Sequence, residues 1–225
     1  AFAGTITEHT GTLEITDDTG VDITATDITT INSASNGAIT VSNAIDINGS
    51  GSQVKAAFDA IDTNTGNATA NITGTDYTVA QLKAINAKTS GAIVLGTPGV
   101  DFTDSSSNLA AAFDGTINSS GNLTVNNNNY TVAELVKINN GTSGNIVLNT
   151  DNVALSGTVA NIKAAFAGTV TTHTGTLEIT DANTTDITAT DITAINETNT
   201  GAITVTNTID INGSGSDVAA AFTAI

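Results

Sequence analysis

The sequence predicts an α/β solenoid, in which short repeats, each made of strands and one helix, stack with their strands parallel. Three observations lead to this prediction: a phrase containing phenylalanine recurs about every 55 residues, an alternating apolar segment recurs about every 27 residues, and a helix-capping residue follows each segment. A sequence period of roughly 20–50 residues is typical of stacked-repeat proteins. The alternative is a straighter parallel β-helix in which the helical segments are single turns.

The longest repeated feature is the phrase written "AAAFDGT" at Ala110. Its phenylalanine occupies Phe2, Phe58, Phe113, Phe166 and Phe222, so neighbouring copies are almost evenly spaced. Residues 1–56 also align without gaps on residues 165–220, with 41 of 56 positions identical, so three units make one super-repeat. The predicted units are 1–56, 57–111, 112–164 and 165–220, with a further unit beginning at 221–225. We expect residues 1–225 to be a single array and a fragment of a longer repeat region.

Each unit contains two alternating segments that are typical of strands with one buried face. Examples are "GTLEIT" at Gly11, "GAITVS" at Gly37 and "GNIVLN" at Gly144. Apolar residues occupy every second position, which is the side-chain period of a strand. The eight segments begin at Gly11, Gly37, Gly66, Gly91, Gly121, Gly144, Gly175 and Gly201. We expect them to lie side by side as parallel strands about 4.8 Å apart.

A four-residue box follows each segment and predicts a short strand and then a helix. Its versions include "VDIT" at Val21, "IDIN" at Ile45 and "VDFT" at Val100. The fourth residue is always Thr, Asn or Ser, whose side chains cap helix N-termini. In "VDFT" the predicted cap is therefore Thr103. The apolar anchor of the helix lies seven residues after the cap in one class of repeat and ten in the other, and the classes alternate. Such short helices are stable only when they pack on neighbouring repeats.

Composition restricts the partners and the chemistry of the chain. Five Lys and Arg residues stand against 22 Asp and Glu residues, so the net charge is −17 at pH 7. A field of this sign repels nucleic acids and anionic membranes, and neither is an expected partner. The chain has no cysteine, which excludes disulfides and thiolate metal sites. No apolar run approaches the ~20 residues of a membrane span.

One column of acidic residues is the candidate metal site. The second residue of the box is an aspartate in six repeats, namely Asp22, Asp46, Asp76, Asp101, Asp186 and Asp210, and it is replaced by Asn129 and Ala154 in the other two. If the boxes stack in register, like charges lie close together and need compensation. Calcium shared between repeats would supply it, because Ca²⁺ takes several oxygen ligands at once. Alternatively, each carboxylate accepts backbone N–H groups at a turn or helix start. Calcium is therefore the only cofactor for which the sequence offers candidate ligands.

No constellation in the sequence predicts catalysis. His9 and His173 are the only histidines, and they occupy the same position of the super-repeat, so they are one copied residue rather than two parts of a site. We expect them to be surface turn residues. The Gly-rich "NGSGS" at Asn48 and Asn212 lacks the lysine of a phosphate-binding loop and is expected to be a flexible turn. The sequence therefore predicts no catalytic or cofactor-binding residue and a protein that is not an enzyme.

The tandem phrases resemble those of one class of proteins. "VDFT…AAAFDGT" at Val100 and "YTVAELVKI" at Tyr130 are similar in style and composition to the tandem-repeat regions of giant bacterial, including cyanobacterial, cell-surface proteins and large repeat adhesins. The resemblance covers the whole chain and carries no catalytic residues. It implies an extracellular or cell-surface fibre, filament or spacer whose partners are further copies or adjacent repeats. Its alternative implication is a calcium- or carbohydrate-binding adhesin module.

Overall fold

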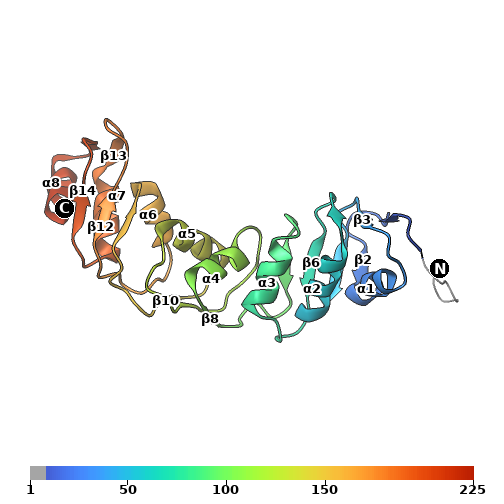
Figure 1. The fold of residues 1–225 in the computed structure, drawn as a ribbon. Coiled ribbons are helices and arrows are strands. Elements are labelled where there is room, and N and C mark those ends of the chain that lie inside the picture. The colour runs from blue at the N-terminus through green and yellow to red at the C-terminus, as the bar shows by residue number, and fades with distance from the viewer. Residues whose placement is uncertain (1–8) are drawn as a thin grey trace. The chain divides into compact units, whose positions relative to one another are not determined.

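A computed structural model describes residues 9–225 as short parallel strands and helices that alternate along the chain (Figure 1). The eight helices in this range are α1 (Ala25–Ser33), α2 (Gly51–Ala60), α3 (Val79–Asn86), α4 (Ser106–Phe113), α5 (Val132–Gly141), α6 (Val159–Ala165), α7 (Ala189–Thr198) and α8 (Gly215–Ala224). One helix follows each of the eight alternating segments, as the sequence predicts. We number the repeats 1 to 8 by the helix that each contains.

The strands are two to four residues long. They are β1 (Leu13–Ile15), β2 (Asp22–Thr24), β3 (Ile39–Val41), β4 (Asp46–Gly49), β5 (Thr63–Asn64), β6 (Thr69–Ile72), β7 (Ile93–Leu95), β8 (Phe102–Asp104), β9 (Leu123–Val125), β10 (Ile146–Leu148), β11 (Leu155–Gly157), β12 (Leu177–Ile179), β13 (Asp186–Thr188), β14 (Ile203–Val205) and β15 (Asp210–Asn212). Their ladders are all parallel, so the predicted α/β class with parallel strands is confirmed.

The chain divides into two compact parts. The first holds residues 9–100 and 111–120, and the second holds residues 101–110 and 121–225. In the first part, β1-β3-β5 form one sheet and β2-β4-β6-β7 form another; the second part has the sheets β8-β9-β10, β11-β12-β14 and β13-β15. Consecutive helices pack on one another, α1 on α2 on α3 in the first part and α5 through α8 in the second (Figure 1). Within residues 9–225, no helix has the length and apolar character needed to cross a lipid bilayer.

Every strand ladder joins two consecutive repeats, but the offset between paired residues varies along the chain. Leu13 pairs with its equivalent Ile39 in the next alternating segment. By contrast, β8, from the box of repeat 4, pairs with β9, the alternating segment of repeat 5. The boxes therefore pair with each other in some repeats, as in β2–β4, and with an alternating segment in others, as in β8–β9. A short strand with one buried face accepts any parallel neighbour of the same alternation, and loop length then decides the register.

Helix starts differ between odd and even repeats. In odd repeats the cap is the fourth residue of the box, as predicted: Thr24, Thr78, Thr131 and Thr188 each accept a hydrogen bond from a backbone N–H three residues later. In even repeats the box residues continue as a strand, and the hydroxyl that accepts this bond comes two residues later, at Ser50, Ser105, Thr158 and Ser214. The predicted cap Thr103 is wrong, because it lies in β8 opposite Thr124.

The apolar anchors form the core. Ile85, Ile138 and Ile195 are no more than 1% exposed, and Phe58, Phe113 and Phe166 no more than 4%; Phe222 alone among the described copies is open, at 65%, and Phe2 lies outside the described residues. Two buried tyrosines tie neighbouring repeats together. Tyr77 donates a hydrogen bond to the Thr97 carbonyl oxygen at 2.6 Å, and Tyr130 donates to the Thr150 carbonyl oxygen at 2.7 Å.

We expect the free energy of unfolding to fall at alkaline pH because of Tyr130. Burial and the nearby Asp151 carboxylate raise its pKa to about 12, against the opposing effect of the Val153 backbone, and burial also raises the pKa of Tyr77. Since the folded pKa exceeds the ordinary value of 10.0, the contribution is complete below pH 10 and is lost as the pH rises toward 12.

Ultraviolet titration of a Tyr77→Phe variant measures this pKa, because Tyr130 is then the only tyrosine and the chain has no tryptophan. The titration midpoint should lie near 12 in the folded chain and near 10 in concentrated urea. Equal midpoints in the two states would contradict the buried hydroxyl.

Candidate functional site

The predicted aspartate column is present only as two separate pairs. Asp22 lies opposite Asp46 in the β2–β4 ladder, and Asp186 lies opposite Asp210 in the β13–β15 ladder. An asparagine crosses each pair: Asn48 Nδ2 donates to Asp22 Oδ1 at 2.8 Å, and Asn212 Nδ2 donates to Asp186 Oδ1 at 2.9 Å. These amide donors offset part of the repulsion between the stacked carboxylates.

The other two predicted ligands do not join a column. Opposite Asp46, on the side away from Asp22, lies Thr69 rather than Asp76. Asp101 accepts hydrogen bonds from the backbone N–H of Asn122 at 2.6 Å and from its Nδ2 at 3.3 Å. The six aspartates therefore do not form one ladder, because the strand register shifts from repeat to repeat. Asp101 instead accepts a hydrogen bond from a backbone N–H of the next repeat, at the residue before β9 and not at a helix start.

Calcium removal provides a direct test of these pairs. Among residues 9–225, no three His, Asp or Glu side chains lie close enough together to hold a metal ion. We expect the thermal midpoint of unfolding to be the same in EGTA and in millimolar calcium. A ligand that binds only the folded state raises the midpoint with its concentration, so a calcium-dependent rise would contradict this expectation.

His173 is buried, which contradicts the expected surface turn. Its side chain is fully buried: Nε2 lies 2.8 Å from the Val153 carbonyl oxygen and Nδ1 lies 2.9 Å from Asn199 Oδ1. The ring also lies against Phe166, with 5.3 Å between ring centroids. Its copy His9 is half-buried and contacts Ser35 Oγ through Nδ1 at 3.0 Å. His173 therefore packs between consecutive repeats and contacts residues of both.

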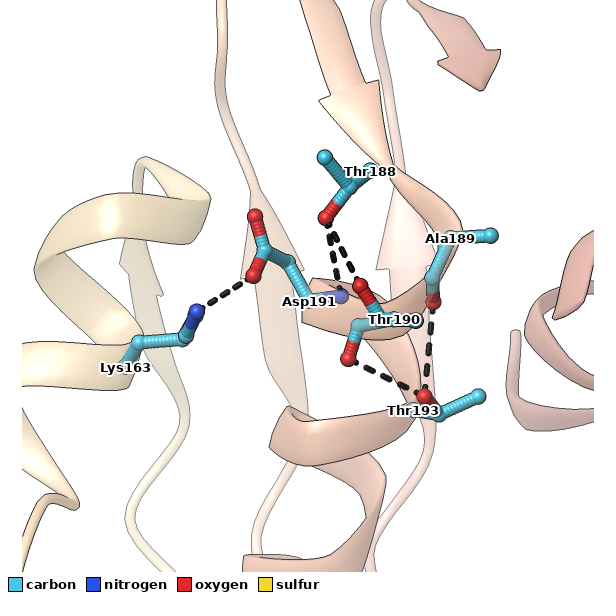
Figure 2. Close-up of polar contacts among 6 residues, drawn as sticks. All are labelled: Lys163, Thr188, Ala189, Thr190, Asp191 and Thr193. Carbon is cyan, nitrogen blue, oxygen red and sulfur yellow. Dashed lines mark hydrogen bonds and ion pairs between the residues drawn. The ribbon is translucent and has the colours of Figure 1, made fainter. Parts of the chain in front are cut away.

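The candidate functional site is a groove between repeats 6 and 7, in the second part of the chain. It has a volume of about 480 Å³ and is lined by Val159, Ala160, Lys163, Asp181, Thr185, Asp186, Ile187 and Asp191. Lys163 on α6 reaches across the groove and pairs with the Asp191 carboxylate on α7, as Figure 2 shows. Asp181 accepts a hydrogen bond from the Val159 backbone N–H at 2.8 Å. Repeat 6 is thus bound to repeat 7 by an ion pair between two helices and by a hydrogen bond from the first turn of α6.

Local hydrogen bonds hold Asp191 in place. Thr188 Oγ1 caps α7 by accepting a bond from the Asp191 backbone N–H at 3.2 Å, and it lies 3.1 Å from Thr190 Oγ1 (Figure 2). Thr193 Oγ1 donates to the Thr190 carbonyl oxygen one turn earlier, at 3.0 Å. The Lys163–Asp191 ion pair was not predicted from the sequence. Its signal is the spacing of the two residues, which lie about one repeat apart.

We expect the Lys163→Ala variant to raise the pKa of Asp191. The hydrogen bond from Lys163 lowers the pKa of that carboxyl group, partial burial opposes the change, and the Thr188 hydroxyl adds to the lowering. Since the folded pKa is depressed, the stabilisation is present above the ordinary pKa near 3.8 and is lost as the pH falls below it. Both side chains are partly exposed, so the cost is less than about 1 kcal/mol.

Carboxyl titration followed by NMR measures the pKa of Asp191 in both chains. Lys55→Ala is the matched control, because it removes an exposed lysine that pairs with Asp59 inside α2. An Asp191 pKa that is identical in wild type and Lys163→Ala would show that the pair is not formed in solution.

A copy of this groove lies in repeat 1. Its lining includes Asp17, Asp22, Ile23 and Asp27, which are the super-repeat counterparts of Asp181, Asp186, Ile187 and Asp191. The lining of the copy includes no lysine.

The comparisons with known proteins add no relative. A scan against protein-family models and searches of curated proteins and of solved structures found no match to this chain.

Proposed function

We propose that the chain is a structural repeat protein whose repeats stack as an α/β solenoid and form an extracellular fibre, filament or cell-surface spacer. One observation carries the proposal: every strand ladder runs between consecutive repeats, from β1–β3 to β13–β15. The strands of one repeat pair only with strands of neighbouring repeats. A repeat on its own would therefore leave the backbone groups of its strands without hydrogen-bond partners, and it gains stability by stacking.

Side-chain contacts at repeated positions support stacking. Asn86 Nδ2 donates to the Ala111 carbonyl oxygen at 2.9 Å, and one unit further along the chain Asn139 Nδ2 donates to the Ala164 carbonyl oxygen, also at 2.9 Å. These contacts connect the end of one helix to the helix of the next repeat. The same sequence position therefore makes the same contact in successive units, as a translationally repeated interface requires.

The resemblance of the tandem phrases to giant surface proteins supports the extracellular part of the proposal. The net charge of −17 favours a dispersed, hydrated surface. An antibody raised against this chain should label intact host cells or material outside them. Labelling only after the cells are permeabilised would overturn the extracellular location.

Small-angle X-ray scattering tests the stacking itself. A chain with a second copy of residues 1–164 placed before residue 1 keeps the repeat phase, because residues 165–168 repeat residues 1–4. Linear stacking predicts that the longest dimension grows about 1.7-fold, in proportion to the number of repeats. A globular chain would grow only about 1.2-fold, as roughly the 0.38 power of its length. The smaller increase would refute the proposal.

A further inference from the structure

The grooves of repeats 1 and 7 have aspartates at the same positions, but they differ in which residues pack over them. Repeat 7 is covered by repeat 6: Leu155 pairs with Leu177, the Val159 N–H bonds to Asp181, and Lys163 bonds to Asp191. Under this cover, the apolar side chains of repeat 7 are closed from solvent, with Leu177 0%, Ile187 4% and Ile195 1% exposed.

The same side chains of repeat 1 are more open. Leu13, Ile23 and Ile31 are each half-buried, and Asp17 and Asp27 are exposed. Among residues 9–225, β1 pairs only with β3 and β2 pairs only with β4, so each is an edge strand of its sheet. Repeat 1 therefore presents the surface that repeat 6 covers in repeat 7.

We infer that this face of repeat 1 is a docking surface for a repeat of the 142–164 type, selected by a lysine at the position of Lys163. The inference rests on the proposed stacking function and adds which repeat fits. The partner supplies three features seen at repeat 7: a short parallel strand for Leu13–Ile15, a helix-start N–H for Asp17, and an ammonium group for Asp27. Charge is the selective feature, because the lining of the docking face carries carboxylates and no cation.

A second copy of the chain fits this face less well. Its repeat 8 is of the same class as repeat 6 and exposes Phe222. However, alignment on the phenylalanine places Ala219 where Lys163 stands and Asp217 where Asn161 stands. Docking α8 on repeat 1 would thus bring a carboxylate toward the aspartates of the groove without a lysine, and like charges at close range are unfavourable.

Three fused chains test the inference. In the lysine fusion, residues 142–164 are placed directly before residue 1, which recreates the junction between residues 164 and 165. In the control fusion, the appended segment carries Lys163→Ala. Residues 89–111 provide a natural second control of equal length, with Ala110 at the lysine position.

The readouts are hydrogen exchange at Thr16 and the melting temperature. At repeat 7 the Thr180 N–H donates to the Gly157 carbonyl oxygen at 3.0 Å, and Thr16 is the counterpart of Thr180. Docking should therefore slow exchange at Thr16 by about tenfold or more in the lysine fusion. The lysine fusion should also melt at a higher temperature than both control fusions, and Asp27→Asn should remove that advantage, because Asp27 is the counterpart of the Asp191 that pairs with Lys163.

The outcomes separate the stacking of repeats, the docking surface and the selection by lysine. Equal slowing in all three fusions with equal melting temperatures would leave stacking intact and overturn the lysine selection. No slowing at Thr16 in any fusion would overturn the docking surface and weaken the stacking proposal with it. Concentration-dependent slowing in the unfused chain, accompanied by dimer formation, would assign the surface to a second copy instead.

Discussion

The Phe58→Ala variant is expected to lose about 3–5 kcal/mol of unfolding free energy, the usual cost of removing a buried phenylalanine ring. Phe58 is 1% exposed, and it lies on α2, which packs between α1 and α3. Truncation therefore leaves a cavity between repeats that neighbouring side chains fill only in part. The loss should appear as earlier urea unfolding of the first part of the chain.

Phe222→Ala is the matched control for this prediction. Phe222 occupies the same super-repeat position as Phe58 but is 65% exposed, so its truncation should cost less than about 1 kcal/mol. Residue-specific hydrogen exchange in urea separates the two parts of the chain and measures both losses. Equal losses at the two positions would show that stacking on a following repeat does not bury the phenylalanine.

The second large effect is expected from Gly201→Ala. A Cβ atom on Gly201 would lie 2.0 Å from the Gly175 carbonyl oxygen and 2.5 Å from its carbon, which are backbone atoms of the preceding repeat. These atoms move only if the strands β12 and β14 separate. We expect a loss of at least about 3 kcal/mol, at the upper end of the cost of overpacking. A Cβ atom on Gly37, the super-repeat counterpart, would lie 1.6 Å from the Gly11 carbonyl oxygen, so Gly37→Ala should have a similar effect.

Gly215→Ala is the control for the glycine prediction. No atom lies within 4 Å of a Cβ placed on Gly215, which begins α8 in the same part of the chain. The substitution should be neutral or stabilising by up to about 1 kcal/mol, because alanine favours the helix. Urea unfolding of the two variants, followed by circular dichroism, gives both values. If Gly201→Ala unfolds at the same urea concentration as Gly215→Ala, the close backbone contact between repeats is absent.

Much of the local structure is predictable from side-chain patterns. Alternating segments such as "GTLEIT" form strands because one face, as at Leu177 and Ile179, is buried. Caps in odd repeats, such as Thr131 with Glu134, are predictable because the capping box is a local interaction between residues three apart. Local rules therefore account for where most strands and the odd helices begin.

Pairing between repeats is less predictable, because it depends on loop length and not on the strand residues alone. The sequence does not show that β8 pairs with β9, or that Asp46 faces Thr69 and not Asp76. The burial of His173 depends on Val153 and Asn199, which belong to the repeats on either side and contact the ring only once the register is set. The Lys163–Asp191 pair depends on the same register.

Disulfide formation between engineered cysteines is a direct test of whether consecutive repeats stack in parallel. Ser156, Glu178 and Thr204 lie in one row across β11, β12 and β14, and the chain has no cysteine of its own. In-register neighbours in a parallel sheet are about 4.8 Å apart, within the Cα range that a disulfide spans, whereas positions two strands apart exceed it. Parallel stacking of consecutive repeats predicts cross-linking of the cysteine pairs 156/178 and 178/204 but not of 156/204. Failure of the 178/204 pair, or equally fast intramolecular closure of 156/204, would contradict stacking.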